Sequence, residues 1–282
     1  MRPIAFGAHR SPKDKRDHRD RKLSQAFPYP QKHEVDMGPI RSFYQGEIGI
    51  CTGAALVVAI MEYLHYKRSG KYVQLSVAFL YIVTKVYVDK NLNEGSALRS
   101  ALKAAYKYGV CTEATFPTDI DMSHEQFVTQ VIPKTAWNEA LNYTIGGYIS
   151  IPIDESLIAA AMWKYGPLYA RMEVGNTWFT PSWLEKDISP LTRSKKIISG
   201  HAVALTAYDL SNDNKQMWLK NSWGPEWFRK GNGLFNYRDY KPTEVWAVTL
   251  DSTMHMPDPN ISFLDSASQK ILDILRKIGE IF

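Results

Sequence analysis

The chain has 282 residues, of which 45% are hydrophobic and 22% are charged, and its formal net charge is +5. This composition is ordinary for a globular protein with one large domain or two modest ones. No stretch reaches the roughly 18 apolar residues that a membrane-spanning helix needs. Two cysteines do not make a disulfide framework, which favours a reducing compartment or a protein that needs no bridge.

Residues 1–36 are polar and interrupted by prolines, so we expect an extended N-terminal extension. The residues Met1–Lys15 lack the apolar core of a secretory signal. The run HRSPKDKRDHRDRK (His9–Lys22) is basic, and such an arm can bind nucleic acid or an anionic membrane. Three aspartates interleave the bases, however, so we favour a solvated, poorly ordered extension and expect no nucleic-acid partner.

Helices are expected in the first half of the chain. The stretch from Cys51 to Arg68 is apolar on most faces, which predicts a buried helix that stops at Gly70. Further helices are expected over residues 77–88, over residues 96–108, where Gly109 follows, and over residues 155–163, before the sequence YGP.

After Pro167 the pattern changes to short strands. The runs LYARMEV, HAVALTAYDL, QMWLKNSW, GLFNYRDY and EVWAVTL are rich in β-branched and aromatic residues and are divided by Gly, Asn and Asp. We expect an antiparallel sheet or barrel here. Segregated helices and strands predict an α+β fold of two lobes, with a ligand site in the cleft between them.

The last residues, 253–282, are interpreted as a linker and an amphipathic helix, because apolar residues recur there at spacings of three and four. Three roles remain open for this helix. It packs on its own domain, it pairs with a second copy or a partner protein through residues 262–282, or it lies on a membrane surface.

Cys51 is the first candidate for chemistry, because it opens the predicted buried helix. A thiol attacks as its thiolate, and the unpaired N–H groups and positive dipole end of a helix N-terminus favour that anion. Cys111 follows a helix end without such a setting, so we expect it to be structural.

A thiolate needs a nearby imidazole, and seven histidines compete for that role. Six are set aside by position. His201 begins a predicted strand of the second lobe and would face the cleft. Those set aside lie in the polar extension, at the far end of the Cys51 helix, in a polar loop and in the linker: His9, His18, His33, His65, His124 and His255.

Three further side chains complete the predicted site. Asn221, at the end of the next strand, would accept a hydrogen bond from the His201 ring, and Trp223 would cover that bond from water. Gln45, six residues before Cys51, would donate to an oxyanion together with the Cys51 N–H.

These blocks resemble a known family. QGEIGIC, SGHAVALTAYD and WLKNSWGPEWFRKGNGLF occur in the order and spacing of the active-site blocks of papain-family cysteine peptidases. The segment Asn93–Pro117 resembles one wall of that family's substrate cleft, and KYGPLYARMEV resembles a floor strand of its second lobe. The start, AHRSPKDKRDH, is similar to the lead-in of bacterial, archaeal and viral members. The resemblance covers roughly residues 8–250.

The resemblance implies a peptidase domain over residues 37–252 that hydrolyses peptide bonds through a Cys51 thioester. His201 would act as acid and base, Asn221 would orient it, and Gln45 would stabilise the oxyanion. The implied substrate-binding residues are Gly95, Ser96, Gly200, Ala202, Trp223 and Trp227. The expected partner is a protein or peptide substrate, no cofactor or metal is expected, and the expected location is cytoplasmic or virion-associated.

The chain departs from the family pattern at several positions. Ile48 replaces a usual cysteine, Thr52 replaces a usual tryptophan, and the cleft wall reads Glu94-Gly95-Ser96 instead of carrying Gly-Gly. Gly200 replaces an aspartate of plant members, and Arg171 is a candidate to point into the cleft. We expect no latency through a folded pro-domain. Two alternatives stay open: a catalytically silent binding or assembly protein, and an acyl transferase with the same triad.

Overall fold

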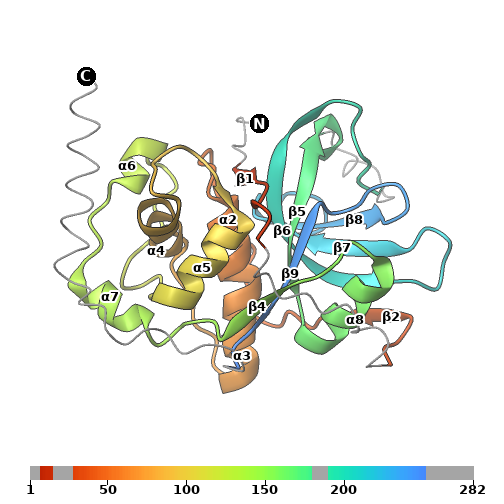
Figure 1. Ribbon diagram of the computed structural model, residues 1–282, viewed down its shortest axis with the longest axis horizontal. Coiled ribbons are helices and arrows are strands. Elements are labelled where there is room, and N and C mark those ends of the chain that lie inside the picture. The colour runs from red at the N-terminus through yellow and green to blue at the C-terminus, as the bar shows by residue number, and fades with distance from the viewer. Residues whose placement is uncertain (1–6, 15–27, 180–189, 252–282) are drawn as a thin grey trace.

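A computed structural model describes residues 7–14, 28–179 and 190–251. Helices gather in one lobe and most strands in the other (Figure 1). The fold is therefore the expected two-lobed α+β arrangement. The predicted C-terminal helix lies outside the described residues. None of the helices in the described ranges is long and apolar enough to cross a membrane.

A central helix forms the middle of the helical lobe. It runs without a break through α2 (Cys51–Ala54), the π-helical η1 (Ala55–Met61) and α3 (Glu62–Ser69), which confirms the helix predicted from Cys51. Every residue of α2 and η1 is buried, as the apolar pattern predicts. The helix ends at Gly70, whose φ of 71° suits the left-handed conformation of a glycine cap.

Shorter helices surround the central helix: α4 (Val77–Val83), the π-helical η2 (Thr84–Asp89), α5 (Leu98–Tyr108), α6 (His124–Val128) and α7 (Lys134–Ala140). The first three confirm the helices expected over 77–88 and 96–108. The expectation that His124 lies in a loop is wrong, because it begins α6. A capping box between Ser123 and Gln126 starts that helix, and this sequence signal was overlooked.

The second lobe is a seven-stranded sheet with the order β4-β9-β5-β6-β7-β8, and β2 pairs with β6 beside this path. Its strands are β2 (Lys32–Glu34), β4 (Gly147–Ser150), β5 (Leu168–Gly175), β6 (Ile197–Asp209), β7 (Gln216–Lys220), β8 (Asn232–Asn236) and β9 (Glu244–Thr249), and α8 (Glu155–Tyr165) packs against it. The strands expected after Pro167 are confirmed, and every pairing in this sheet is antiparallel. One boundary is corrected, because β6 starts at Ile197 and His201 lies inside it.

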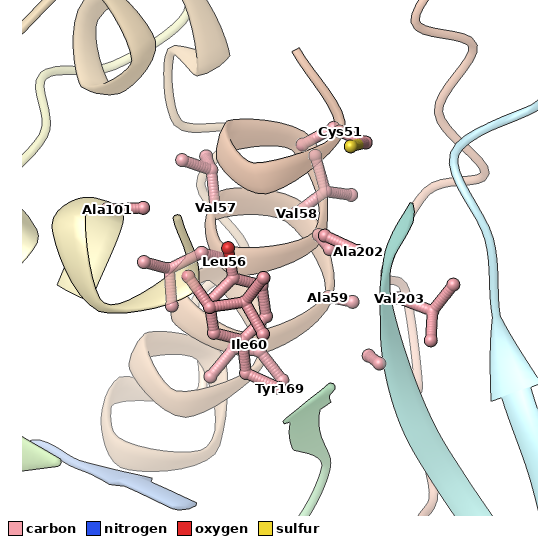
Figure 2. Packing of buried hydrophobic residues seen from close by; sticks show 14 of the residues in the cluster. Cys51, Leu56, Val57, Val58, Ala59, Ile60, Ala101, Tyr169, Ala202 and Val203 are labelled. Atoms are coloured by element: carbon pink, nitrogen blue, oxygen red, sulfur yellow. The ribbon is translucent and has the colours of Figure 1, made fainter. Parts of the chain in front are cut away.

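The two lobes share one hydrophobic core. Figure 2 shows Val58 of the central helix on the side that faces Ala202 of β6, and η1 contacts both β5 and β6. The Tyr169 hydroxyl also donates a hydrogen bond of 2.9 Å to the Thr52 carbonyl. The helix that carries Cys51 is thereby fixed against the sheet that carries His201.

The N-terminal extension pairs with both lobes where it is described. β1 (Ala8–His9) pairs in parallel with β3 (Ser96–Ala97) and lies between the two lobes (Figure 1). Further along, β2 pairs with β6 on the second lobe. The expectation of a poorly ordered arm is therefore wrong for residues 9–14, whereas the expectation of solvated side chains holds for most of them, because His9, Arg10, Pro12 and Lys13 are exposed. Burial of Ala8 and the ion pair of Arg10 with Glu173 hold this charged segment on the protein surface.

Candidate active site

Cys51 begins the central helix, and its side chain is fully buried. Its sulfur lies on the side of the helix that faces the β6 strand (Figure 2). Burial raises the pKa of this thiol to about 11, while backbone hydrogen bonds from Ala202, Gly7, Thr52 and Cys51 itself act to lower it. In this conformation burial outweighs the helix terminus, so at neutral pH the group is a thiol.

His201 is held by Asn221, as expected. The distance between His201 Nε2 and Asn221 Oδ1 is 2.6 Å, and both residues are buried. Asn221 Oδ1 also accepts a hydrogen bond of 2.8 Å from the Ser222 N–H, so it acts as an acceptor and Nε2 of His201 is the donor. Nδ1 is then the basic nitrogen of the neutral ring. Burial lowers the pKa of His201 to about 4, although the bond to Asn221 acts to raise it.

Aromatic rings enclose the His201–Asn221 pair. Trp223 lies 4.8 Å from the His201 ring, measured between centroids, and Trp178 lies at 5.8 Å. Trp178 was not predicted, because it comes from η3 (Asn176–Trp178), which no sequence signal connects to the site. Trp227 stacks on Trp178 and donates its Nε1–H to the Trp178 carbonyl over 3.2 Å. Trp227 thus supports the enclosing rings, and its role in substrate binding stays a prediction.

Gln45 is buried next to the strand end that carries Asn221. Its Oε1 accepts a bond of 2.7 Å from the Ser222 hydroxyl, and its backbone N–H donates to the Ser222 carbonyl. Its Nε2 donates to the Ile48 carbonyl over 2.9 Å, within the loop that leads to Cys51. Ser222 therefore sets the orientation of the Gln45 amide, a role that was missed although the residue stands inside the NSWG motif.

The wall of the helical lobe is fixed by Glu94 and Tyr81. The Gly49 N–H donates to the Glu94 carboxylate over 2.7 Å, which ties the wall to the loop before Cys51. The Gly95 N–H donates to the Tyr81 hydroxyl over 2.8 Å. Glu94 is one of the departures from the family pattern, and these contacts give it a structural role.

The segment Gly7–Pro12, called the strap below, lies across this wall. Gly7 accepts a hydrogen bond of 2.6 Å from the Ser96 N–H and contributes one of the backbone hydrogen bonds to the Cys51 thiol. A Cβ placed on Gly7 would lie 2.1 Å from the Gly49 carbonyl oxygen, so only glycine fits here. The strap thus covers the thiol. It also uses backbone hydrogen-bonding positions next to Gly95 and Ser96, which were predicted to bind substrate.

The strap also contacts the second lobe. Its Ala8 carbonyl accepts a bond of 2.9 Å from Arg171 Nε, and a Cβ on Gly200 would lie 2.2 Å from that carbonyl oxygen. Arg171 therefore extends from β5 to the strap and holds it there. Gly200 was also predicted to bind substrate. Because it has no side chain, the strap backbone can lie against it.

Side chains after Ala8 anchor the strap from outside. Arg10 forms an ion pair of 2.8 Å with Glu173, and the Ser11 hydroxyl donates to Glu244. Arg99 donates to the Pro12 carbonyl. His9 Nε2 lies 3.1 Å from the Glu94 carbonyl oxygen, so this histidine, set aside in the extension, is at the cleft wall.

Two other predicted features can be placed. Cys111 is buried and forms no disulfide. Burial raises its pKa to about 12, which fits a structural thiol. Thr52 is buried, and its hydroxyl has no hydrogen-bond partner among the described residues. Nothing in the structure explains why threonine stands there. No cluster of three or more His, Cys, Asp or Glu suited to a metal occurs in the described ranges.

The fold and this site define a class of protein: two lobes, with a thiol at the start of a central helix and a histidine–asparagine pair on the opposing sheet. Comparison with known families identifies the chain itself. The profile of the papain family of cysteine proteases matches residues 29–244, and the chain belongs to that family.

Individual relatives are distant. "Probable cysteine protease RD19D" of Arabidopsis thaliana is 29% identical over 206 residues, which is 66% of this chain and 51% of that protein. Cathepsin J of Mus musculus is 25% identical over 71% of this chain and 57% of its own length. The chain thus spans little more than half the length of these curated relatives. The structure of xylellain, a cysteine protease from Xylella fastidiosa, superposes with a TM-score of 0.74 at 20% identity, covering 87% of this chain and 96% of that one.

Proposed function

We propose that this protein is a cysteine endopeptidase that hydrolyses peptide bonds through a thioester on Cys51. The observation that carries the proposal is the hydrogen bond of 2.6 Å between His201 on β6 and Asn221, which directly follows β7. It leaves Nδ1 of the neutral ring as the site that can accept the thiol proton.

The proton and bond changes follow from this arrangement. His201 Nδ1 takes the proton of Cys51, and the thiolate attacks the substrate carbonyl carbon. The imidazolium then gives its proton to the leaving amine as the C–N bond breaks, which leaves a thioester. Water then attacks the thioester carbonyl carbon while His201 removes one of its protons, and the C–S bond breaks as that proton passes to the sulfur, which releases a carboxylic acid and restores the thiol.

The negative charge that develops on the carbonyl oxygen needs donors. The Cys51 N–H at the start of the central helix is one, and the Gln45 amide is the other. A primary amide has two N–H donors, so Gln45 can keep its bond to Ile48 and still donate to substrate. Ser222 holds the amide in this orientation through Oε1.

Substrate can reach Cys51 only after the strap moves. The strap uses the Ser96 N–H and the space beside Gly200 that an extended substrate would need. Its departure would also admit water to the site, which removes part of the burial that keeps both Cys51 and His201 neutral. The described conformation is therefore a closed form, and the reactive ion pair belongs to an open one.

Active-site labelling tests the proposal. A thiol-directed peptidyl epoxide should label the wild-type chain once, label Cys111→Ala equally, and fail to label Cys51→Ala, as read by intact-mass spectrometry. The Cys111 variant is a matched control because both thiols are buried. Full labelling of Cys51→Ala would refute the proposal, as would full hydrolysis of casein by that variant.

A further inference from the structure

A cavity of about 840 Å³ lies on the second lobe, separate from Cys51 and His201. Its walls are β2, the residues that follow it up to Ser42, parts of β6 and β7, and the turn at Arg229–Asn232. None of the proposed catalytic residues lines it. The volume falls within the range of roughly 300–1,000 Å³ that small-molecule sites occupy.

Lys220 lines this cavity from the last position of β7, and the residue is only 8% exposed. Among the described residues, none forms an ion pair or a hydrogen bond with its ammonium group. The acid that acts on it at longer range is Glu62, whose carboxylate already accepts from Arg41, Tyr72 and the Leu75 N–H. Its Nζ is not among the fully buried nitrogens without a partner, so the ammonium is open to an anion that enters the cavity.

More cations lie at the mouth of the cavity. Arg229 and Lys230 are exposed there and take part in no ion pair within the described chain. Lys230 has a φ of 51°, unusual for a residue with a side chain, and its carbonyl accepts a bond of 2.9 Å from the Ser42 hydroxyl. The backbone of this turn is thus fixed while its two cationic side chains stay available to a ligand.

The other charged residues of the lining do not cancel these cations. Lys32 pairs with Asp209 at 3.2 Å. Glu34 and Asp36 add two negative charges, and one oxygen of Asp36 accepts from the Gly38 N–H. Lys220, Arg229 and Lys230 therefore exceed the lining acids by one charge, and the ring of Trp218 supplies an apolar wall beside them.

We propose that this cavity, named the Lys220 site, binds a small phosphate-bearing molecule whose anionic oxygens pair with Lys220 inside and with Arg229 and Lys230 at the mouth. Lysine and arginine are the usual partners of phosphate oxygens. The volume of this half-open cavity is typical of small-molecule sites, so we assign it a small molecule rather than a nucleic acid strand or a protein.

Calorimetric titration of the full chain with inorganic pyrophosphate tests the proposal. Binding is measured and not peptidase activity, because Lys220 adjoins Asn221 and its replacement can disturb His201. We expect one saturable site whose affinity falls as NaCl is raised from 20 to about 300 mM, since salt screens the charges. Lys220→Met should weaken binding at least tenfold, and Lys67→Met, which changes an exposed lysine of the helical lobe, should leave it unchanged.

A second measurement protects the test against misfolding. Lys220→Met removes a charge that has no partner among the described residues and keeps a largely buried apolar side chain of similar length, so its melting temperature without ligand should equal or exceed that of the wild type. Lys220→Arg keeps the charge and should retain binding. The proposal is overturned if wild-type protein does not bind pyrophosphate at 20 mM NaCl. It is also overturned if Lys220→Met binds as well as Lys67→Met, or if citrate binds more tightly than pyrophosphate.

Discussion

Asn221 is the residue whose contribution can be isolated most cleanly. Asn221→Ala removes the acceptor of the 2.6 Å bond from His201, and a bond to a group that becomes charged is worth about 1.5–3 kcal/mol. We expect kcat/KM for a peptide substrate to fall by roughly 10- to 150-fold.

The pH profile distinguishes orientation from a general structural defect. In Asn221→Ala the basic limb of the kcat/KM profile should move to lower pH, because the imidazolium loses the bond that raises its pKa. Asn142→Ala changes an exposed asparagine of the other lobe and should leave rate and profile unchanged. An Asn221→Ala enzyme with the wild-type profile would exclude the orienting role.

The protonation of Cys51 gives a second prediction. Burial raises the pKa of this thiol to about 11, so at pH 7 the thiolate is a small fraction of the closed form. The rate of alkylation by iodoacetamide, measured on Cys111→Ala, should therefore keep increasing as the pH rises from 6 to 10. A rate that is already constant below pH 7 would show that the closed form does not dominate in solution.

The strap is the element with the most direct effect on activity. Glu173 forms two ion pairs. One joins it to Arg10 of the strap at 2.8 Å, and the other joins it to Arg193, outside the strap, at 3.1 Å. Arg10→Ala should raise kcat/KM about two- to fivefold, because an exposed pair contributes up to about 1 kcal/mol to the closed form.

Arg193→Ala is the matched control for this change. It breaks the other bond to the same carboxylate without touching the strap, so its kcat/KM should equal that of the wild type. Equal rates in the Arg10 and Arg193 variants would mean that the strap does not limit access to Cys51.

The central helix is the element that fixes Cys51, the proposed nucleophile. Leu56 is fully buried in the shared core, and Leu56→Ala should lower the free energy of unfolding by about 2–5 kcal/mol through lost burial and the cavity left behind. Val131 is 76% exposed, so Val131→Ala should change the free energy of unfolding by less than about 0.5 kcal/mol. Urea denaturation followed by circular dichroism measures both, and equal losses would contradict the described burial.

Sequence reasoning performs differently on elements and on contacts. The central helix and the strands after Pro167 could be predicted, because each depends on apolar patterns within one stretch. The positions of Cys51, His201, Asn221 and Gln45 could be predicted because each stands in a short motif. Trp178, Ser222 and the strap could not be predicted, since their roles depend on contacts over tens to more than a hundred residues. The charges of residues 9–22 indicated a poorly ordered arm instead.

At the scale of the whole molecule, the shared core predicts cooperative unfolding. One cluster of buried residues includes both the central helix and strands β5 and β6. The helical lobe dominates the far-ultraviolet circular dichroism, while tryptophans of the second lobe, such as Trp178 and Trp246, report by fluorescence. The two signals should give the same urea midpoint. Two separate midpoints would show that the lobes unfold independently.

The central claim is that this chain cleaves peptide bonds with Cys51, and hydrolysis of a mixed peptide library by the Arg10→Ala chain tests it most directly. That variant weakens the strap and leaves every proposed catalytic residue in place. Mass spectrometry should detect cleaved peptides with the Arg10→Ala chain. These products should be absent when the chain also carries Cys51→Ala, and they should remain when it carries Cys111→Ala instead. Cleavage that survives Cys51→Ala, or no cleavage by the Arg10→Ala chain, would contradict the account.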